Sequence, residues 1–208
     1  MCEDMARSAA VTSTTLSQDA TTRARLIEAA LLLFRRHGYH GIGVSEILAL
    51  SGISKGSLYH HFPDGKQELG VEVVQHITER ILEMFARSRS PTTELLLRRV
   101  GAKIARWMQS TGDGPLAVLA SFAVESRGEP RLRLAVRAAY NELEQFLQGR
   151  LQADGFDAAT AADRARLTIA LFEGGGVLSQ VHGQPRLFSL AIEHAARLCA
   201  PPAAGEDR

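Results

Sequence analysis

The stretch that decides the fold is VSEILALSGISKGSLYHHF, which occupies residues 44–62. Val44, Ile47 and Leu48 are spaced three and four residues apart, so they share one face of a predicted helix. Gly52 can adopt the left-handed backbone conformation that commonly ends a helix. The first half of the stretch therefore predicts a short helix followed by a sharp reversal of the chain.

The second half of the stretch predicts another short helix. Ser54 is a suitable N-cap, and Leu58 and Phe62 are four residues apart and face inward. The opposite face centres on Gly56, whose missing side chain lets a partner's backbone come close. A basic, hydroxyl-rich helix after a tight turn is how many proteins place one helix in the DNA major groove. An ordinary helical hairpin in a core has the same spacing, so the flanking sequence has to separate the two interpretations.

The residues that flank the hairpin favour DNA binding. Upstream, the apolar spacing of residues 22–37 predicts an amphipathic helix that stops at Gly38. Between residues 20 and 62 there are five Lys and Arg and two Asp and Glu, so the net charge is 5 − 2 = +3, whereas the whole chain carries only +1. A basic end on a nearly neutral chain fits local contact with a polyanion.

At these residues the chain resembles the TetR family of one-component transcriptional regulators. The similarity lies in the helix at 22–37, in the hairpin, and above all in ISKGSLYHHF at residues 53–62, followed by Lys66. The form HFPDGKQEL resembles the LmrA-type branch, whose better-known members respond to drugs or plant-type aromatic compounds. Two residues depart from the family pattern: Gly43 stands where a Thr cap is frequent, and Leu48 stands where Ala is frequent.

The resemblance implies a DNA-binding role for the matching residues of the hairpin and its neighbours. Some would line the groove, and others would hold phosphates from the helix ends. For Tyr59 the alternative is a surface aromatic ring packed on its neighbour. The residues expected to contact DNA are Thr22, Arg23, Ser45, Ser54, Lys55, Gly56, Ser57, Tyr59, His60 and Lys66.

The rest of the chain continues the helical pattern and shows no alternating strand pattern. We expect further helices over residues 66–89, 92–110, 116–127, 132–153, 158–182 and 187–199. The predicted fold is all-α, with nine helices in a TetR-like arrangement. Its parts are an N-terminal arm (1–19), a three-helix helix-turn-helix DNA-binding domain (20–65), a helical ligand-binding and dimerisation domain (66–200) and a C-terminal tail (201–208).

The C-terminal domain is expected to hold a ligand pocket, because bulky and adaptable side chains collect on its middle helices. Glu125 and Glu173 lie in otherwise apolar stretches, where an unpaired carboxylate is costly. Either carboxylate could meet a cationic or hydrogen-bonding ligand, or only an Arg of the protein. The predicted pocket residues, each with plain core packing as its alternative, are His76, Met84, Trp107, Met108, Phe122, Glu125, Tyr140, Phe146, Phe172 and Glu173.

The two last predicted helices are expected to form a homodimer, since one helix-turn-helix reads only a few base pairs. Three consecutive glycines in the eighth helix cost about 2–3 kcal/mol of helix propensity, which a close helix–helix approach would offset. A kink in the helix is the alternative. The predicted interface residues are Gly174, Gly175, Gly176, Ser179, Leu190 and His194.

These features predict a ligand-responsive repressor that binds a palindromic operator as a dimer. A small hydrophobic or aromatic effector would release it from double-stranded DNA. The alternatives are a ligand-dependent activator, a helical protein-binding adaptor, or an enzyme that uses Glu193 and His194 together with His182 or Glu173. For the enzyme alternative, the sequence contains neither an HExxH motif nor a phosphate-binding loop.

The composition of the chain bears on metal binding, cofactors and the cellular compartment. The only cysteines, Cys2 and Cys199, lie near opposite ends and form no metal or disulfide pattern, so neither a metal nor a cofactor is expected. No apolar run approaches the ~20 residues of a membrane span, and the first 19 residues lack the apolar core of a secretory signal. We therefore expect a cytoplasmic protein with no membrane partner.

Overall fold

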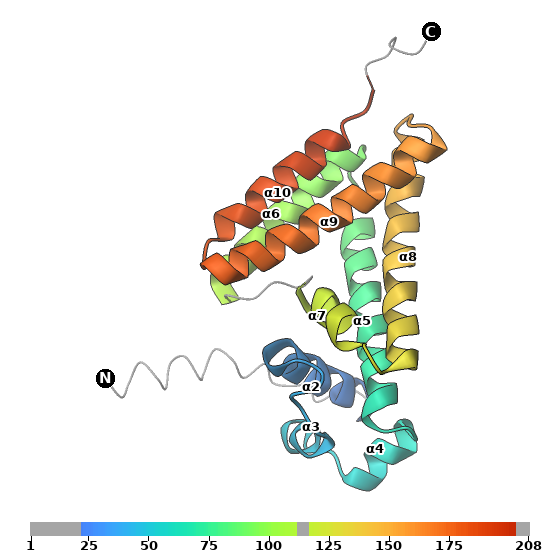
Figure 1. The fold of residues 1–208 in the computed structure, drawn as a ribbon, viewed down its shortest axis with the longest axis vertical. Coiled ribbons are helices and arrows are strands. Elements are labelled where there is room, and N and C mark those ends of the chain that lie inside the picture. The colour runs from blue at the N-terminus through green and yellow to red at the C-terminus, as the bar shows by residue number, and fades with distance from the viewer. Residues whose placement is uncertain (1–21, 112–116, 203–208) are drawn as a thin grey trace, which may run out of the picture. The chain divides into compact units, whose positions relative to one another are not determined.

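The computed structural model describes residues 22–111 and 117–202 (Figure 1). Within these residues the chain forms nine α-helices and no strand, which confirms the all-α prediction. The chain divides into two compact units, Met1–Leu69 and Gly70–Arg208. The predicted arm at 1–19 and the last six residues of the predicted tail lie outside the described residues.

Unit 1 is the three-helix part that the sequence predicted. Its helices are α2 (Thr22–His37), α3 (Val44–Ser51) and α4 (Lys55–His61), and it also includes the start of α5 (Lys66–Arg87). Helix α2 contacts both α3 and α4. The core of unit 1 is made of large apolar side chains that are at most 2% exposed: Leu26, Phe34, Ile47, Leu58 and Phe62. Of the apolar positions of the opening stretch, Ile47, Leu58 and Phe62 are buried as their spacing indicated, whereas Val44 and Leu48 are half-buried.

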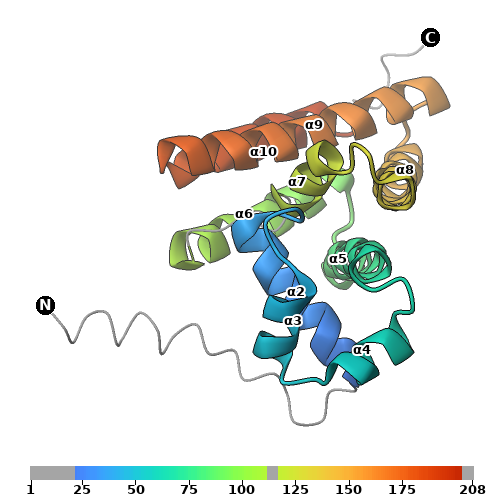
Figure 2. The same ribbon diagram turned by 60° about the horizontal axis from the view of Figure 1, so that its bottom comes forward.

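Unit 2 contains the remainder of α5 and five further helices. Their bounds are α6 (Thr93–Thr111), α7 (Ala117–Glu125), α8 (Pro130–Ala153), α9 (Ala158–His182) and α10 (Pro185–Leu198). Helix α9 packs against α8 and α10, and α10 also packs against α6. Figures 1 and 2 both show α9 and α10 running side by side. The core of unit 2 lies among these long helices.

Two helices begin earlier than the sequence analysis expected, and both begin with proline. Pro130 is the first residue of α8 and Pro185 the first of α10, whereas we expected these helices to begin at residues 132 and 187. Proline suits the first helical position because the N–H that it lacks would have no partner inside the helix there. Both errors came from placing these prolines before the helix instead of at its first position.

Small residues let α10 approach its two neighbours closely. A Cβ atom on Gly101 of α6 would overlap the side chain of Ile192, and a Cβ on Gly175 of α9 would lie 2.5 Å from the Cβ of Ala191. Such separations are far below van der Waals contact, so replacing either glycine requires a neighbouring side chain or a helix to shift. The two glycines thus determine how near α10 lies to α6 and α9.

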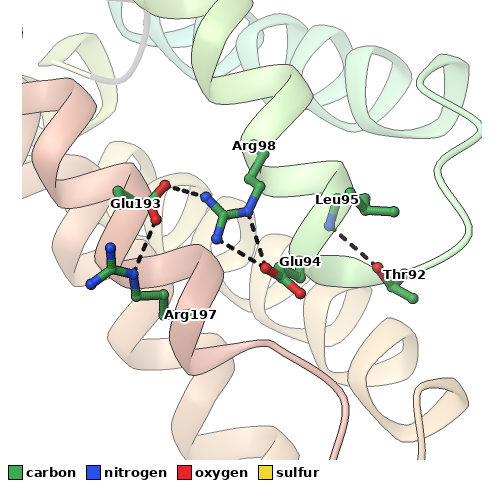
Figure 3. Close-up of polar contacts among 6 residues, drawn as sticks. All are labelled: Thr92, Glu94, Leu95, Arg98, Glu193 and Arg197. Carbon is green, nitrogen blue, oxygen red and sulfur yellow. Dashed lines mark hydrogen bonds and ion pairs between the residues drawn. The ribbon is translucent and has the colours of Figure 1, made fainter.

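A charged network joins α6 to α10 (Figure 3). Arg98 of α6 donates hydrogen bonds to Glu94 on its own helix, at 2.9 and 3.0 Å, and to Glu193 on α10. Glu193 also accepts from Arg197 at 3.0 Å. The hydrogen bond from Arg98 is the main reason why the pKa of Glu193 lies below its ordinary value, with a smaller contribution from Arg197.

Candidate DNA-binding surface and ligand cavity

The turn between α3 and α4 is built as the sequence predicted. Gly52 has a φ of +66° and its N–H donates to the carbonyl of Leu48 at 3.0 Å, so the glycine ends α3 in the left-handed conformation. A residue that sequence reasoning treated only as a charge also stabilises the turn. The guanidinium of Arg25, on α2, donates to the carbonyl of Ser51 at 2.7 Å. Arg25 therefore ties the first helix to the end of the second.

Helix α4 begins with the predicted cap. The hydroxyl of Ser54 accepts a hydrogen bond from the N–H of Ser57 at 3.2 Å, and the two hydroxyls lie 3.0 Å apart. Gly56, between these two serines in the sequence, has open space around it, because a Cβ there would meet only the Ser54 hydroxyl at 4.0 Å. The N-terminal half of α4 therefore presents hydroxyls and bare backbone to the surface, beside the positive end of the helix.

Most of the residues predicted to contact DNA lie on the surface of unit 1. Exposed side chains or backbone are found at Arg23, Ser45, Ser54, Lys55, Gly56, Tyr59 and His60, whereas Thr22, Ser57 and Lys66 are half-buried. The ammonium group of Lys66 lies 4.3 Å from the centre of the Tyr39 ring. The structure thus gives Lys66 an aromatic neighbour that the sequence did not indicate.

Tyr59 has a local packing partner as well as an exposed surface. It is 42% exposed, and a Cβ on Gly65 would lie 3.1 Å from its ring. Gly65 has a φ of +61°, which only glycine adopts readily. Packing of Tyr59 on its neighbour was the alternative to a DNA contact, and the ring position is compatible with both.

The two departures from the family pattern have different structural outcomes. Gly43 is the N-cap of α3 and supplies no side-chain hydrogen bond, as expected of a residue without a side chain. Leu48 is half-buried, and its carbonyl accepts from both Gly52 and the hydroxyl of Ser51. The start of α3 therefore lacks a side-chain cap, whereas Gly52 caps its end through a backbone hydrogen bond.

Unit 2 contains a small cavity between α5, α8 and α9. It is lined by Ile81 and Phe85 of α5, Leu143 and Leu147 of α8, and Thr168, Ile169, Phe172 and Glu173 of α9. Its volume is about 20 Å³, which is room for a water molecule rather than for a drug-sized ligand. A larger ligand would have to move the lining side chains or the helices that carry them.

Glu173 is the one charged residue of this lining. Its Oε1 accepts a hydrogen bond from the hydroxyl of Tyr140 at 2.9 Å. Its Oε2 is buried and has no hydrogen-bond partner among the described residues. Burial raises the pKa of Glu173 to about 7, and the hydrogen bond from Tyr140 opposes that rise. The pKa of Tyr140 is also raised, mainly by burial and then by the nearby carboxylate.

The structure brings together only part of the predicted pocket. Phe172 and Glu173 line the cavity, Tyr140 bonds to Glu173, and Phe146 stacks on Phe85 with ring centres 5.6 Å apart. Tyr140 and Phe146 therefore contact lining residues without lining the cavity themselves. The other predicted residues do not line it either: His76, Met84, Trp107, Met108, Phe122 and Glu125. The aliphatic lining was missed because leucine and isoleucine on a helical stripe look like ordinary core.

Helix α9 has two apolar faces. The inner face is buried against the rest of unit 2 and consists of Ala161, Ala165, Thr168, Phe172, Gly175, Gly176 and Ser179. Ser179 accepts a hydrogen bond from the N–H of Phe188 at 2.7 Å. Gly175 and Ser179 therefore pack against α10 of the same chain, where we had expected them at the dimer interface. The helix is continuous through the glycine triplet, so it is not broken there.

The outer face of α9 points to solvent. Leu178 is 51% exposed and Val181 74% exposed, and Leu167, Leu171 and Gly174 precede them at spacings of three and four residues. On α10, Leu190 and His194 are also exposed. Gly174 meets nothing within 4 Å. The outer face is thus an apolar stripe with a gap at Gly174.

The residues of the enzyme alternative have separate partners. Glu193 bonds to Arg98 and Arg197, whereas Glu173 bonds to Tyr140. Within residues 22–111 and 117–202, no group of three or more His, Cys, Asp and Glu could hold a metal ion. No helix of this part of the chain is long and apolar enough to cross a bilayer.

Two family models match the chain, one in each half. The model described as bacterial regulatory proteins, tetR family, matches residues 26–73. The model described as transcriptional regulator LmrA/YxaF-like, C-terminal domain, matches residues 93–194. The first match includes the whole of α3 and α4, and the second includes the cavity-lining residues of α8 and α9.

Individual proteins agree with these matches. The chain is 31% identical to the HTH-type transcriptional regulator LmrA of Bacillus subtilis over 164 residues, which are 76% of this chain and 86% of the relative. It is 30% identical to the uncharacterized HTH-type transcriptional regulator YxaF of the same organism, over 76% of this chain and 84% of the relative. Among solved structures, a TetR transcriptional regulator from Legionella pneumophila has the same fold, with a TM-score of 0.78, 19% identity and coverage of 88% of this chain and 100% of that chain.

Proposed function

We propose that this chain, which belongs to the TetR family of bacterial regulatory proteins and is a helix-turn-helix transcriptional regulator, is a dimeric repressor that a small effector releases from its operator. The observation that carries the proposal is the exposed face of α4, with its hydroxyls, Lys55 and open Gly56. Such a helix can enter the major groove with its N-terminal residues toward the bases.

Dimer formation is supported by the outer face of α9. A helix that is apolar on both sides needs a second partner, and its inner face is already occupied by unit 2. A second copy related by a two-fold axis would cover Leu178 and Val181 with the same residues of its partner. The two helix-turn-helix domains of the dimer (the DNA-binding heads), spaced about one helical turn of DNA, ~34 Å, would then read a palindrome.

Effector control is supported by the course of α5. This single helix runs from Lys66, a predicted phosphate contact, to Ile81 and Phe85 in the cavity lining. A ligand that displaces Ile81 or Phe85 acts directly on the helix that carries Lys66. The coupling between two such sites typically amounts to about 1–3 kcal/mol.

The test is a mobility-shift titration of the full chain on DNA that flanks its own gene. We expect specific binding that weakens with salt. In a Lys55→Ala, Lys66→Ala double variant the slope of log affinity against log salt should be smaller by about 4, because each of the two protomers loses two cations. A matched control removes two exposed charges from α6, Lys103→Ala with Arg106→Ala, and should leave the slope unchanged.

Unchanged affinity of the double variant at low salt would contradict the assignment of the head. The absence of any shift at low salt would favour the helical adaptor. Deletion of the gene distinguishes the two signs of regulation: expression from the adjacent promoter should rise for a repressor and fall for a ligand-dependent activator. An activator would bind DNA through the same surface, so only the direction of the change in promoter expression distinguishes it from a repressor.

A further inference from the structure

The cavity contains one hydrogen-bond acceptor that the protein leaves unsatisfied. Oε2 of Glu173 is buried without a partner among the described residues, while Oε1 is held by Tyr140. A buried acceptor without a donor costs free energy, and a buried carboxylate without a counter-charge costs more. A ligand that donates to Oε2 would remove this cost.

Among the described residues, none of those that line the cavity brings a cation to this carboxylate. Helix α5 presents Ile81 and Phe85 to the cavity, and α8 presents Leu143 and Leu147. From α9 itself the lining is apolar apart from Thr168, whose hydroxyl lies 3.3 Å from the sulfur of Cys199. Tyr140, from α8, is the titratable group that acts on Glu173. A cationic group is therefore the chemical complement that the lining lacks.

We propose that the effector of this chain is an apolar molecule with one protonated amine, and that the amine pairs with Oε2 of Glu173 while the apolar part lies against the cavity lining. The inference rests on the proposed function only in calling the ligand an effector. An ammonium group would donate to Oε2 and also neutralise the buried carboxylate, whereas an alcohol or a phenol of the same shape would donate without a counter-charge, so the amine gains more at this position.

Tyr140 prepares the carboxylate for this role. Its hydroxyl donates to Oε1, which favours the charged form of Glu173 and orients the other oxygen. Because the pKa of Glu173 is about 7, an amine that binds below pH 7 must displace a proton from the carboxyl group. Affinity for the amine should therefore fall by up to about tenfold for each pH unit below 7 and level off above it.

The experiment compares two small probes of the same shape, 2-phenylethylamine and 2-phenylethanol, by isothermal titration calorimetry with the full-length chain at pH 8. We expect the amine to bind at least about tenfold more tightly than the alcohol. In Glu173→Gln this preference should disappear, because the amide keeps the size of the side chain and an acceptor for Tyr140 but loses the charge. The alcohol should bind both proteins alike, which shows that the cavity is intact.

Glu144→Gln is the matched control. Glu144 is also a carboxylate of the helical bundle, on α8, but it pairs with Arg166 at 3.2 Å and does not line the cavity. This variant should keep the preference for the amine. Tyr140→Phe should reduce the preference in part and move the pH at which amine binding levels off to a higher value, since the charged carboxylate loses a donor.

Equal binding of the two probes by the unchanged protein would overturn the proposal. So would an amine preference that survives Glu173→Gln, or failure of both probes to bind at concentrations up to about 10 mM, a range that still detects very weak ligands. These titrations contain no DNA. A failure of the regulator proposal would appear in the mobility shift alone, and a failure of the amine proposal in calorimetry alone.

Discussion

Arg25 shows how much a single side chain contributes to the DNA-binding head. Its guanidinium reaches the carbonyl of Ser51 at the end of α3, and Gly52 follows directly. The last carbonyls of a helix have no partner within the helix, so this donor from α2 replaces what water would otherwise supply. The orientation of α3 relative to α2, and with it the start of α4, depends on this contact.

Replacement of Arg25 should loosen the turn. In Arg25→Ala we expect a local loss of about 1.5–3 kcal/mol, the usual contribution of a hydrogen bond with one charged partner. The N–H groups of Gly52 and Ile53 should then exchange with solvent at least roughly ten times faster in native-state hydrogen exchange. Arg36→Ala removes an exposed charge from the same helix and should leave these rates unchanged. Equal acceleration in both variants would mean that charge, and not the hydrogen bond, matters.

At the scale of the element, α9 combines two interfaces on one helix. Its inner stripe packs within the chain, and its outer stripe remains exposed. Adjacent glycines serve the two sides differently. Gly175 allows the close approach of Ala191, while Gly174 lies in open space on the outer stripe. The glycine triplet therefore has at least one role inside the protomer.

The two glycines should respond differently to substitution. Gly175→Ala places a methyl group 2.5 Å from the Cβ of Ala191, and such overpacking typically costs about 1–3 kcal/mol. Gly174→Ala meets no such obstacle in the protomer, and helix propensity favours it by up to about 1 kcal/mol. Urea denaturation of both variants under identical conditions measures the difference. A loss of stability in Gly174→Ala as large as that in Gly175→Ala would contradict this division of roles.

For the whole molecule, the central question is how the outer stripe of α9 is covered. The double variant Leu178→Glu, Val181→Glu puts charges on the exposed stripe, and we expect it to be monomeric by size-exclusion chromatography with light scattering at micromolar concentration. Its operator affinity should fall steeply, because one head alone makes half of the contacts. Val124→Glu, a charge on an exposed residue of α7, should leave the dimer intact. A monomer in the unchanged protein would refute the dimer.

Local features were predictable from the sequence for physical reasons. The cap at Ser54, the left-handed Gly52 and the bounds of α2 and α9 all depend on residues within a few positions of one another. Capping, glycine conformation and apolar spacing act over one or two turns of helix, so the sequence shows them directly. The errors at the starts of α8 and α10 were local too, since a proline can end a turn or begin a helix.

Contacts between distant residues were decided by the tertiary structure. Arg25 and Ser51 are 26 positions apart, and Tyr140 and Glu173 are 33 positions apart. Nothing in the local spacing selects such pairs, because they depend on the packing angles of whole helices. For the same reason the sequence indicated that Glu173 was a costly carboxylate but not which of its oxygens would lack a donor.

The sequence by itself thus determined the helices, the head with its exposed α4 and the family to which the chain belongs, because the motif is continuous and its physics is local. The tertiary structure decided which residues surround the cavity and which face of α9 stays open. Those outcomes follow from side chains that meet only after the helices have packed. Packing buries Gly175 against α10 and leaves Gly174, its neighbour in the chain, open to solvent.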